Sequence, residues 1–346
     1  MTENSKNWLH DLYPGYFAMT MATGIITIAF DQHGFSLLYQ IMAAFTFASW
    51  FVLFCLYTWR LFKYPKAVFE NLSNPKTTFM FFTFVAATDI CGMVLLQFGF
   101  EKIAMAAWAI AFVYWSALLY FGFAFLCFAH REREVNVVHG GWLILIVGTQ
   151  SLVILGAKIA PLLGKYAAYM MIEIHMLWAL GMIFYAIFVT LFCYRIFFMN
   201  MEASDYSPLM WVIMGAAAIS ANAGSNLILT DPVIPLFMEM RSVVQMFSIM
   251  LWTWATWWIP LLVIIGIWKH IYLRVPLKYE PMQWSIVFPL GMYTVATENL
   301  ALSAEFHPLI YLSMGMLWVA AASWFVLMIF FIRAKLFNAE KKEAIS

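Results

Sequence analysis

Charged residues are scarce in this sequence. Asp, Glu, Lys and Arg make up 11% of its 346 residues, whereas hydrophobic residues make up 64%. A typical soluble domain has about 25% charged and about 45–50% apolar residues. A soluble globule of this length could not bury so much apolar surface, but lipid can surround it. The scarcity of charge therefore excludes a soluble domain and predicts an integral membrane protein.

Basic patches and cysteine pairs are lacking as well. The net charge is +1, and most Lys and Arg fall in short loops, which excludes a nucleic-acid partner. The chain has four cysteines, all within apolar runs and without CxxC spacing. We interpret them as buried small hydrophobic residues and not as a disulfide or metal set. These cysteines are Cys55, Cys91, Cys127 and Cys193.

Enzyme signatures are absent too. The sequence has no HExxH, no GxSxG, no P-loop and no glycine-rich dinucleotide fingerprint. Among the histidines, only His175 lies well within an apolar run, whereas a membrane haem needs two facing histidines. Glu173 and His175 are two positions apart and point to different helix faces, so they do not predict a metal site. We predict no cofactor, no metal and no enzyme; an intramembrane enzyme is the alternative from another class.

The apolar runs are about 20 residues long or more, which predicts transmembrane helices. A spanning barrel would show alternating segments of about 10 residues. The breaks between runs carry turn residues such as Asn74-Pro75, Pro161 and Asp231-Pro232. The sequence predicts ten spans at 14–33, 35–63, 77–99, 102–130, 140–160, 165–198, 207–230, 240–270, 282–303 and 307–335.

The loop charges predict the orientation. Only four of the 19 Lys and Arg residues, Lys102, Lys158, Lys165 and Arg241, fall opposite the N-terminus. The positive-inside rule then places both termini in the cytoplasm of a cell-membrane protein. The N-terminus lacks a signal-peptide pattern, so we expect the first run to be a retained span. The predicted organisation is a cytoplasmic segment 1–13, a ten-span domain 14–335 and a cytoplasmic tail 336–346.

The spans alternate in character. Odd-numbered spans are shorter and rich in small and hydroxyl residues, as in GYFAMTMATGIITIAF and MGAAAISANAGSN, whereas even-numbered spans are long and bulky. Small residues allow helices to approach closely, and polar residues avoid lipid. We therefore predict five hairpins, with the odd helices inside and the even helices outside. For any single glycine, ordinary helix packing is the competing interpretation.

Charge inside the membrane is expensive and often functional. Asp89 lies near the middle of the third span, and Glu298 lies toward the outer end of the ninth. An anion path would not be expected to hold a naked carboxylate at its centre. Asp89 is thus protonated, turned away and hydrogen-bonded, or a proton-coupling group, and Glu298 is interpreted as a solvated vestibule residue.

Phe288-Pro289 in the ninth span is the sharpest single feature. Proline removes a backbone hydrogen bond and kinks a helix. The bulky neighbour could form a constriction there, or could simply pack in the core.

Four segments now suggest a family: LYPGYFAMTMATGIITIAF, NPKTTFMFFTF, MGAAAISANAGS and WSIVFPLGMYTVAT. They resemble the tellurite-resistance/dicarboxylate transporter family, which includes bacterial tellurite-resistance proteins, fungal malate permeases and plant slow anion channels. The resemblance covers about residues 8–335. It implies ten helices as five hairpins around a pseudo-fivefold pore, and a homotrimer with one pore per protomer.

The resemblance also implies a gate. The family's pore-occluding phenylalanine matches Phe288, beside Pro289. Helix bends at proline or glycine carry over onto Pro289 and more loosely onto glycines of the other odd spans. The chain lacks the long regulated tails of the plant channels, so phosphorylation control is not expected. The candidate pore-lining residues are Thr23, Gly24, Thr88, Gly92, Gly148, Asn222, Gly224, Ser225, Gly291 and Thr294.

The resulting hypothesis is transport of a small anion, a dicarboxylate such as malate or succinate or an inorganic anion, through a phenylalanine-gated pore. Weak dipoles such as Asn222, Ser225 and Thr294 would coordinate the ion, because a tight cationic site would trap it. Alternatives are a sulfite or tellurite-related anion exporter, or a proton-coupled dicarboxylate carrier using Asp89 or Glu298. Lipid is the other expected partner.

Overall fold

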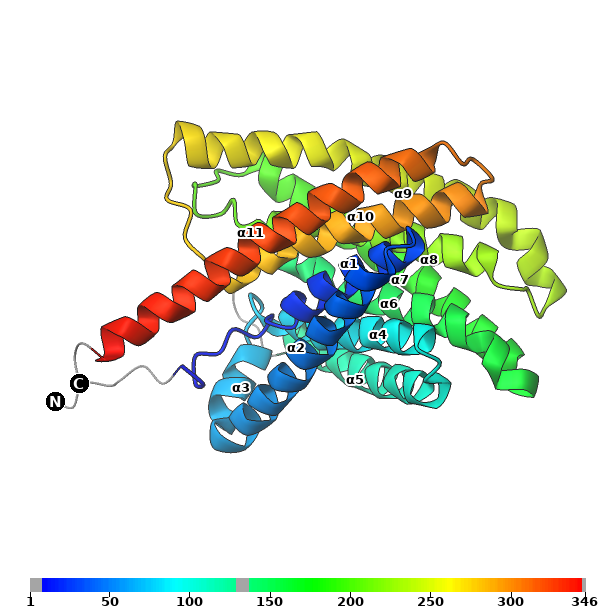
Figure 1. Ribbon diagram of the computed structural model, residues 1–346, viewed down its shortest axis with the longest axis horizontal. Helices are drawn as coiled ribbons and strands as arrows, with labels where there is room; N and C mark the ends of the chain where they lie inside the picture. Colours follow the sequence, from blue (N-terminus) through cyan, green and yellow to red (C-terminus); the bar gives the residue numbers. More distant parts are fainter. Residues whose placement is uncertain (1–7, 129–136, 344–346) are drawn as a thin grey trace.

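The computed structural model describes residues 8–128 and 137–343, with side chains described through residue 336. All regular secondary structure in these ranges is helical (Figure 1). Five shorter helices alternate with five longer ones, which confirms the prediction of an all-α membrane protein. The shorter helices are α1 (Ala18–Gln32), α4 (Phe82–Gln97), α6 (Ile144–Ile159), α8 (Val212–Leu229) and α10 (Trp284–Ser303). The longer helices are α2 (Ser36–Lys63), α5 (Glu101–Phe128), α7 (Ala167–Phe198), α9 (Pro235–Ile267) and α11 (Leu309–Glu343).

Seven described helical segments are long and apolar enough to cross a membrane. One of them, Gly140–Phe198, has 59 residues and contains both α6 and α7. The helix is interrupted at Gly164, whose positive φ of 52° is not helical and lies in a region that glycine adopts readily. The seven segments thus hold eight of the ten predicted spans, and α1 and α10 correspond to the other two. α1 has only 15 residues, and α10 is less apolar.

Short 3-10 and π turns flank several of the helices. Four shorter helices are preceded by a 3-10 turn, which tightens the start of the helix. The helix α3 (Pro65–Leu72), between α2 and α4, was not among the predicted spans. The 3-10 turns are η1 (Thr78–Phe81), η3 (Gly140–Leu143), η5 (Pro208–Trp211) and η7 (Pro281–Gln283); η4 (Ala160–Tyr166) joins α6 to α7, and the π turn η6 (Trp268–Tyr272) follows α9.

Burial separates the two sets of helices as the sequence predicts. In the most apolar stretch of Thr78–Gln97, 83% of residues are buried, against 22% in Ser36–Lys63. Bulky side chains cover the outer helices, and Tyr120 and Tyr311 are examples that are highly exposed. The shorter helices are therefore inner helices, and the longer ones present their side chains to lipid.

The inner helices form a closed ring of contacts. α1 packs on α4, α4 on α6, α6 on α8, α8 on α10, and α10 again on α1. α10 and α11 run side by side, and the described ends of the chain lie on the same side of the molecule (Figure 1). A chain that crosses the membrane an even number of times is expected to have both ends on the same side.

A repeated hydrogen bond ties the outer helices to the ring. In each of the five hairpins, a tryptophan of the outer helix donates its indole N–H to the inner helix of the next hairpin. The acceptor is a threonine hydroxyl in four cases and a backbone carbonyl in one. The pairs are Trp50 to Thr88 (3.1 Å), Trp115 to Thr149 (2.8 Å), Trp178 to the Ser220 carbonyl (3.1 Å), Trp252 to Thr297 (2.9 Å) and Trp324 to Thr23 (3.0 Å).

The interpretation of all four cysteines as buried was wrong for the two exposed ones, and Cys193 on α7 is only half-buried. Cys91, on the inner helix α4, is buried, but Cys55 on α2 and Cys127 on α5 are exposed. Both exposed thiols lie on outer helices. An apolar run alone does not show which face of a spanning helix meets lipid.

Candidate functional site

The candidate site lies on the inner helix α10. Phe288 is only 3% exposed, and Pro289 lies inside the helix directly after it. Because proline has no N–H, the carbonyl of Ser285 loses its partner four residues on, and the helix is weakened there. Gly215 of α8 accommodates the proline ring: a Cβ at that position would lie 2.8 Å from Pro289 Cγ. Inner helices α8 and α10 thus meet closely beside the phenylalanine.

One face of α10 carries Phe288, Met292 and Asn299. Met292 and Asn299 follow Phe288 by four and eleven residues, which are spacings that return to the same side of an α-helix. Asn222 of α8 contacts this face twice. Its Nδ2 donates to the Met292 sulfur at 3.5 Å, and its Oδ1 accepts from Asn299 Nδ2 at 2.7 Å. The Phe288 face of α10 is therefore turned toward another inner helix and away from lipid.

An amide network crosses three inner helices at this point. Asn299 Oδ1 accepts from Gln32 Nε2 of α1 at 3.0 Å, while Asn226 Nδ2 donates to the Asn222 carbonyl at 2.8 Å. These amides are neutral dipoles with both donors and acceptors. Asn222 is among the residues predicted from the sequence, whereas Asn299 and Gln32 are not. Both are amides in otherwise apolar spans, and because polar side chains avoid lipid, this could have indicated that they face other helices.

The hydroxyl groups predicted to line the pore lie outside this amide network. Thr23 and Thr88 accept hydrogen bonds from tryptophans of outer helices, so their hydroxyls lie on the outward side of the ring. The Thr294 hydroxyl donates to the Leu290 carbonyl in its own helix. Ser225 Oγ lies 3.3 Å from Ser303 Oγ, between α8 and α10. The structure brings Asn222, but not Thr23 or Thr88, together with the Phe288 face.

The predicted glycines lie where helices approach closely. For each of them, an added Cβ would come near a side chain of a neighbouring helix. These contacts agree with ordinary helix packing, the interpretation that competes with a pore-lining role for each glycine. The nearest atoms belong to Ile90 for Gly24 (2.3 Å), Leu155 for Gly92 (2.6 Å), Phe82 for Gly148 (3.2 Å), Ser248 for Gly224 (2.1 Å) and Ile25 for Gly291 (2.7 Å).

Asp89 is fully buried at the contact between α4 and α6. Its Oδ2 accepts a hydrogen bond from Ser151 Oγ at 2.7 Å, while Oδ1 is buried without a partner among the described residues. A buried carboxyl oxygen without a hydrogen bond is costly. Such a group is a candidate for exchange of a proton or for contact with a polar ligand.

The interpretation of Glu298 as a solvated residue was wrong, because its exposure is 7%. Its Oε2 lies 3.8 Å from Nε2 of His33, and the same ring nitrogen lies 2.9 Å from Ser313 Oγ. The carboxylate is thus enclosed between α1, α10 and α11, and sequence position near a span end did not reveal this.

Positive charge is absent from the middle of the ring. Lys158, in the last turn of α6, is the one Lys or Arg in the five inner helices, all of which are described. Within the described residues, no three His, Cys, Asp or Glu side chains gather as a metal site would require. Lys158 is thus the one lysine or arginine that the inner helices offer to an ion, and the same helices bury the carboxyl groups of Asp89 and Glu298.

His139 fixes the loop at the start of the third hairpin, outside the spans. Its Nδ1 accepts from the Gly141 N–H at 3.0 Å, and its Nε2 lies 2.9 Å from the Lys76 carbonyl. Burial is the main reason that the pKa of His139 is lowered to about 4. At neutral pH the ring is therefore neutral, with its proton on Nε2 donated to Lys76.

Residues 11–332 match the profile of the SLAC1 family, described as a voltage-dependent anion channel, and the chain belongs to this family. An uncharacterized transporter of Methanocaldococcus jannaschii is 24% identical over 94% of this chain and 95% of its own length. An uncharacterized membrane protein of Mycobacterium tuberculosis is 41% identical over 38% of this chain, and the chain spans 66% of that relative. The predicted resemblance is confirmed, and the chain is a multi-pass protein of a family that transports anions across membranes.

Proposed function

We propose that this chain conducts small anions through the centre of its inner ring, and that Phe288 occludes the path. The observation that supports this most is the place of Phe288: a buried aromatic ring beside a helix-weakening proline, on the α10 face that also carries Asn299. Family membership supports an anion as the transported species.

The neutral surroundings suit conduction. An anion passing the ring would exchange part of its hydration for N–H groups of the Asn222 and Asn299 amides. These dipoles bind weakly, and weak binding lets the ion leave again. Rotation of the Phe288 ring, together with bending of α10 at Pro289, would open the path without movement of whole domains. Dicarboxylates and inorganic anions both belong to the proposed substrate range.

We further propose a homotrimer in the cell membrane, with both termini in the cytoplasm. The loop charges support the orientation, since all Lys and Arg but four lie on the side of the N-terminus. The resemblance to the tellurite-resistance/dicarboxylate transporters supports the trimer.

The test of the gate is anion flux in proteoliposomes. Phe288→Ala removes the ring, and Phe288→Leu keeps part of its volume. Phe192→Ala is the matched control, because Phe192 is equally buried, at 2% exposure, but lies on the outer helix α7. The gate predicts faster flux for the two Phe288 variants alone.

A proton-coupled dicarboxylate carrier is the second candidate, and Asp89 is the observation that favours it. Its unpartnered Oδ1 could accept and release a proton inside the ring while Oδ2 keeps its bond to Ser151. A carrier of this kind needs an inward proton gradient for uptake, whereas the conducting pore does not.

A further inference from the structure

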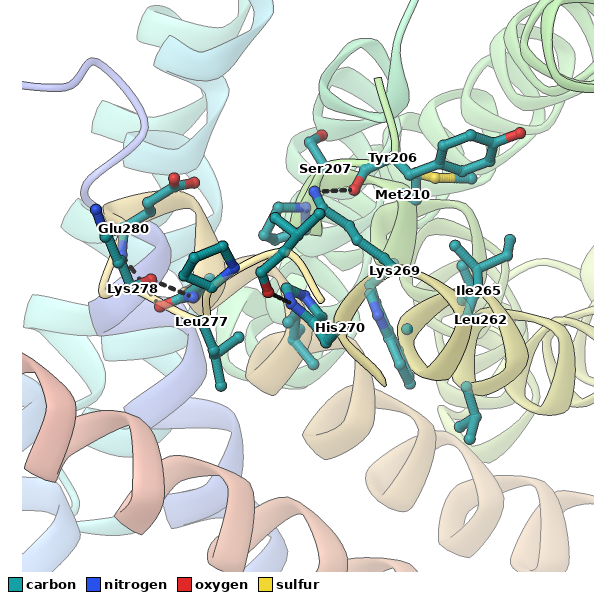
Figure 2. Close-up of a pocket in the computed structure, with 18 residues that line it drawn as sticks. Tyr206, Ser207, Met210, Leu262, Ile265, Lys269, His270, Leu277, Lys278 and Glu280 are labelled. Atoms are coloured by element: carbon teal, nitrogen blue, oxygen red, sulfur yellow. Dashed lines mark hydrogen bonds between the residues drawn. The ribbon is translucent and has the colours of Figure 1, made fainter. Parts of the chain in front are cut away.

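A pocket of about 250 Å³ lies between the end of α9 and the starts of α8 and α10, away from the centre of the ring. We call it the α9–α10 pocket. Three chain segments build it, as Figure 2 shows. Its polar lining comes from Lys269 and His270 after α9, Lys278 and Glu280 in the loop before α10, and Ser207 before α8.

The loop that covers this pocket is folded back on the π turn. Arg274 has a φ of 55°, which reverses the chain direction after η6. The Val275 N–H then donates to the Lys269 carbonyl at 3.1 Å, and His270 Nδ1 lies 2.9 Å from the Val275 carbonyl. One side of the pocket is thus formed by a loop that its own hydrogen bonds hold in place.

The charge of the lining favours an anion. The lining contains two lysines, Lys269 and Lys278, and a single carboxylate, Glu280. Lys269 Nζ donates to the Tyr206 carbonyl at 2.8 Å, which fixes its position and uses one of its three protons. The remaining ammonium protons of Lys269 are available to phosphate oxygens.

The other walls are apolar, and the pocket lies where a spanning helix ends. Leu262, Ile265 and Ile286 supply the apolar wall. Ile271 and Tyr272, on the adjacent turn, are 71% and 76% exposed. Exposed apolar and aromatic residues at the end of a spanning helix meet the lipid headgroup region. A ligand here would therefore combine a negative head with an apolar tail.

We propose that the α9–α10 pocket binds the phosphate headgroup of an anionic phospholipid. Basic residues next to a spanning helix attract such lipids. The pocket also reaches the start of α10, through Gln283 at the end of η7 and Ile286 within α10, and Phe288 follows two residues after Ile286. An occupied pocket therefore steadies the start of α10.

The experiment measures bound lipid on the whole protein. Native mass spectrometry counts the phospholipids retained from an equimolar mixture of phosphatidylglycerol and phosphatidylcholine. The test variant is Lys269→Gln/Lys278→Gln. The control is Lys63→Gln/Lys76→Gln, which removes two lysines on the side of the N-terminus outside this pocket. Circular dichroism confirms that all three proteins are folded.

Wild type and control should retain phosphatidylglycerol in preference to phosphatidylcholine, and the test variant should lose that preference by at least about fivefold. Millimolar inorganic phosphate should leave the lipid in place, because it lacks the acyl chains. Equal retention by test variant and wild type, or displacement by inorganic phosphate, would overturn the proposal. Lipid retention is read without transport, so its failure is distinct from a failure of anion flux.

Discussion

The indole Nε1 of Trp324 donates a hydrogen bond to Thr23 Oγ1 at 3.0 Å, joining residues 301 positions apart. This contact links the last helix, α11, to the first, α1. It is the same bond that joins each other outer helix to the inner helix of the following hairpin. The chain is linear, but this series of hydrogen bonds is cyclic, and the Trp324 bond is the link that joins its last hairpin to its first.

Trp324→Phe should therefore weaken the ring. The change removes the N–H donor and keeps most of the aromatic volume. We expect a loss of about 1 kcal/mol in the free energy of unfolding, since hydrogen bonds between membrane helices contribute about 0.6–2 kcal/mol. Thermal unfolding in detergent, followed by tryptophan fluorescence, measures it.

Trp257→Phe is the control, because Trp257 is 49% exposed on α9, where it stacks on Trp254 and meets Trp258 edge to face. A double-mutant cycle with Thr23→Val isolates the pair. Equal losses for Trp324→Phe and Trp257→Phe, with no coupling to Thr23, would show that the bond contributes nothing to closure.

Gly224→Ala should destabilise the contact between α8 and α9. The new Cβ would lie 2.1 Å from Ser248 Oγ, so the Ser248 side chain or one of the two helices must shift. Overpacking of this kind costs about 1–3 kcal/mol. Ser248→Ala removes the obstructing oxygen, so the double variant should recover much of the lost stability in a thermal melt.

Gly266→Ala is the matched glycine, because nothing lies within 4 Å of its added Cβ. It should be neutral or slightly stabilising, since alanine favours helix. If Gly224→Ala and Gly266→Ala behave alike, close helix approach at Gly224 is not what the position requires.

His139 predicts a loss of stability in acid. Its folded pKa of about 4 lies below the ordinary value of 6.5, mainly because of burial, so the unfolded chain binds a proton first as the pH falls. The contribution of His139 to stability is therefore complete above about pH 6.5 and is lost between pH 6.5 and about 4.

His139→Asn should make the melting temperature less sensitive to pH in that window, because asparagine does not titrate. His10→Asn is the control, since the His10 side chain is about half exposed. An unchanged pH profile for His139→Asn would show that the ring is not the group that titrates.

Asp89→Asn separates the two candidate functions. In a conducting pore, the amide replaces a carboxyl whose Oδ2 accepts from Ser151, and flux should continue without dependence on a proton gradient. In a carrier, the same change should abolish gradient-driven uptake. Uptake of labelled succinate into proteoliposomes, with and without an inward proton gradient, gives the answer.

The sequence predicted the hairpins but not the helix faces. Residue size and polarity along the chain distinguish inner from outer helices, because lipid selects bulky apolar side chains. The direction of the Thr23 hydroxyl depends on Trp324, which no local pattern pairs with it. Asn299 was missed because its partners, Asn222 and Gln32, come from two other helices. The burial of Glu298 also depends on α11 packing over it.

Anion flux through the Phe288 variants tests the central claim most directly. With equal amounts of folded protein in vesicles, Phe288→Ala should raise flux at least about tenfold, Phe288→Leu less, and Phe192→Ala not at all, since relief of a barrier by about 1.4 kcal/mol is already tenfold. Flux through Phe288→Ala no greater than through wild type would contradict an occluding ring at the centre of the five inner helices.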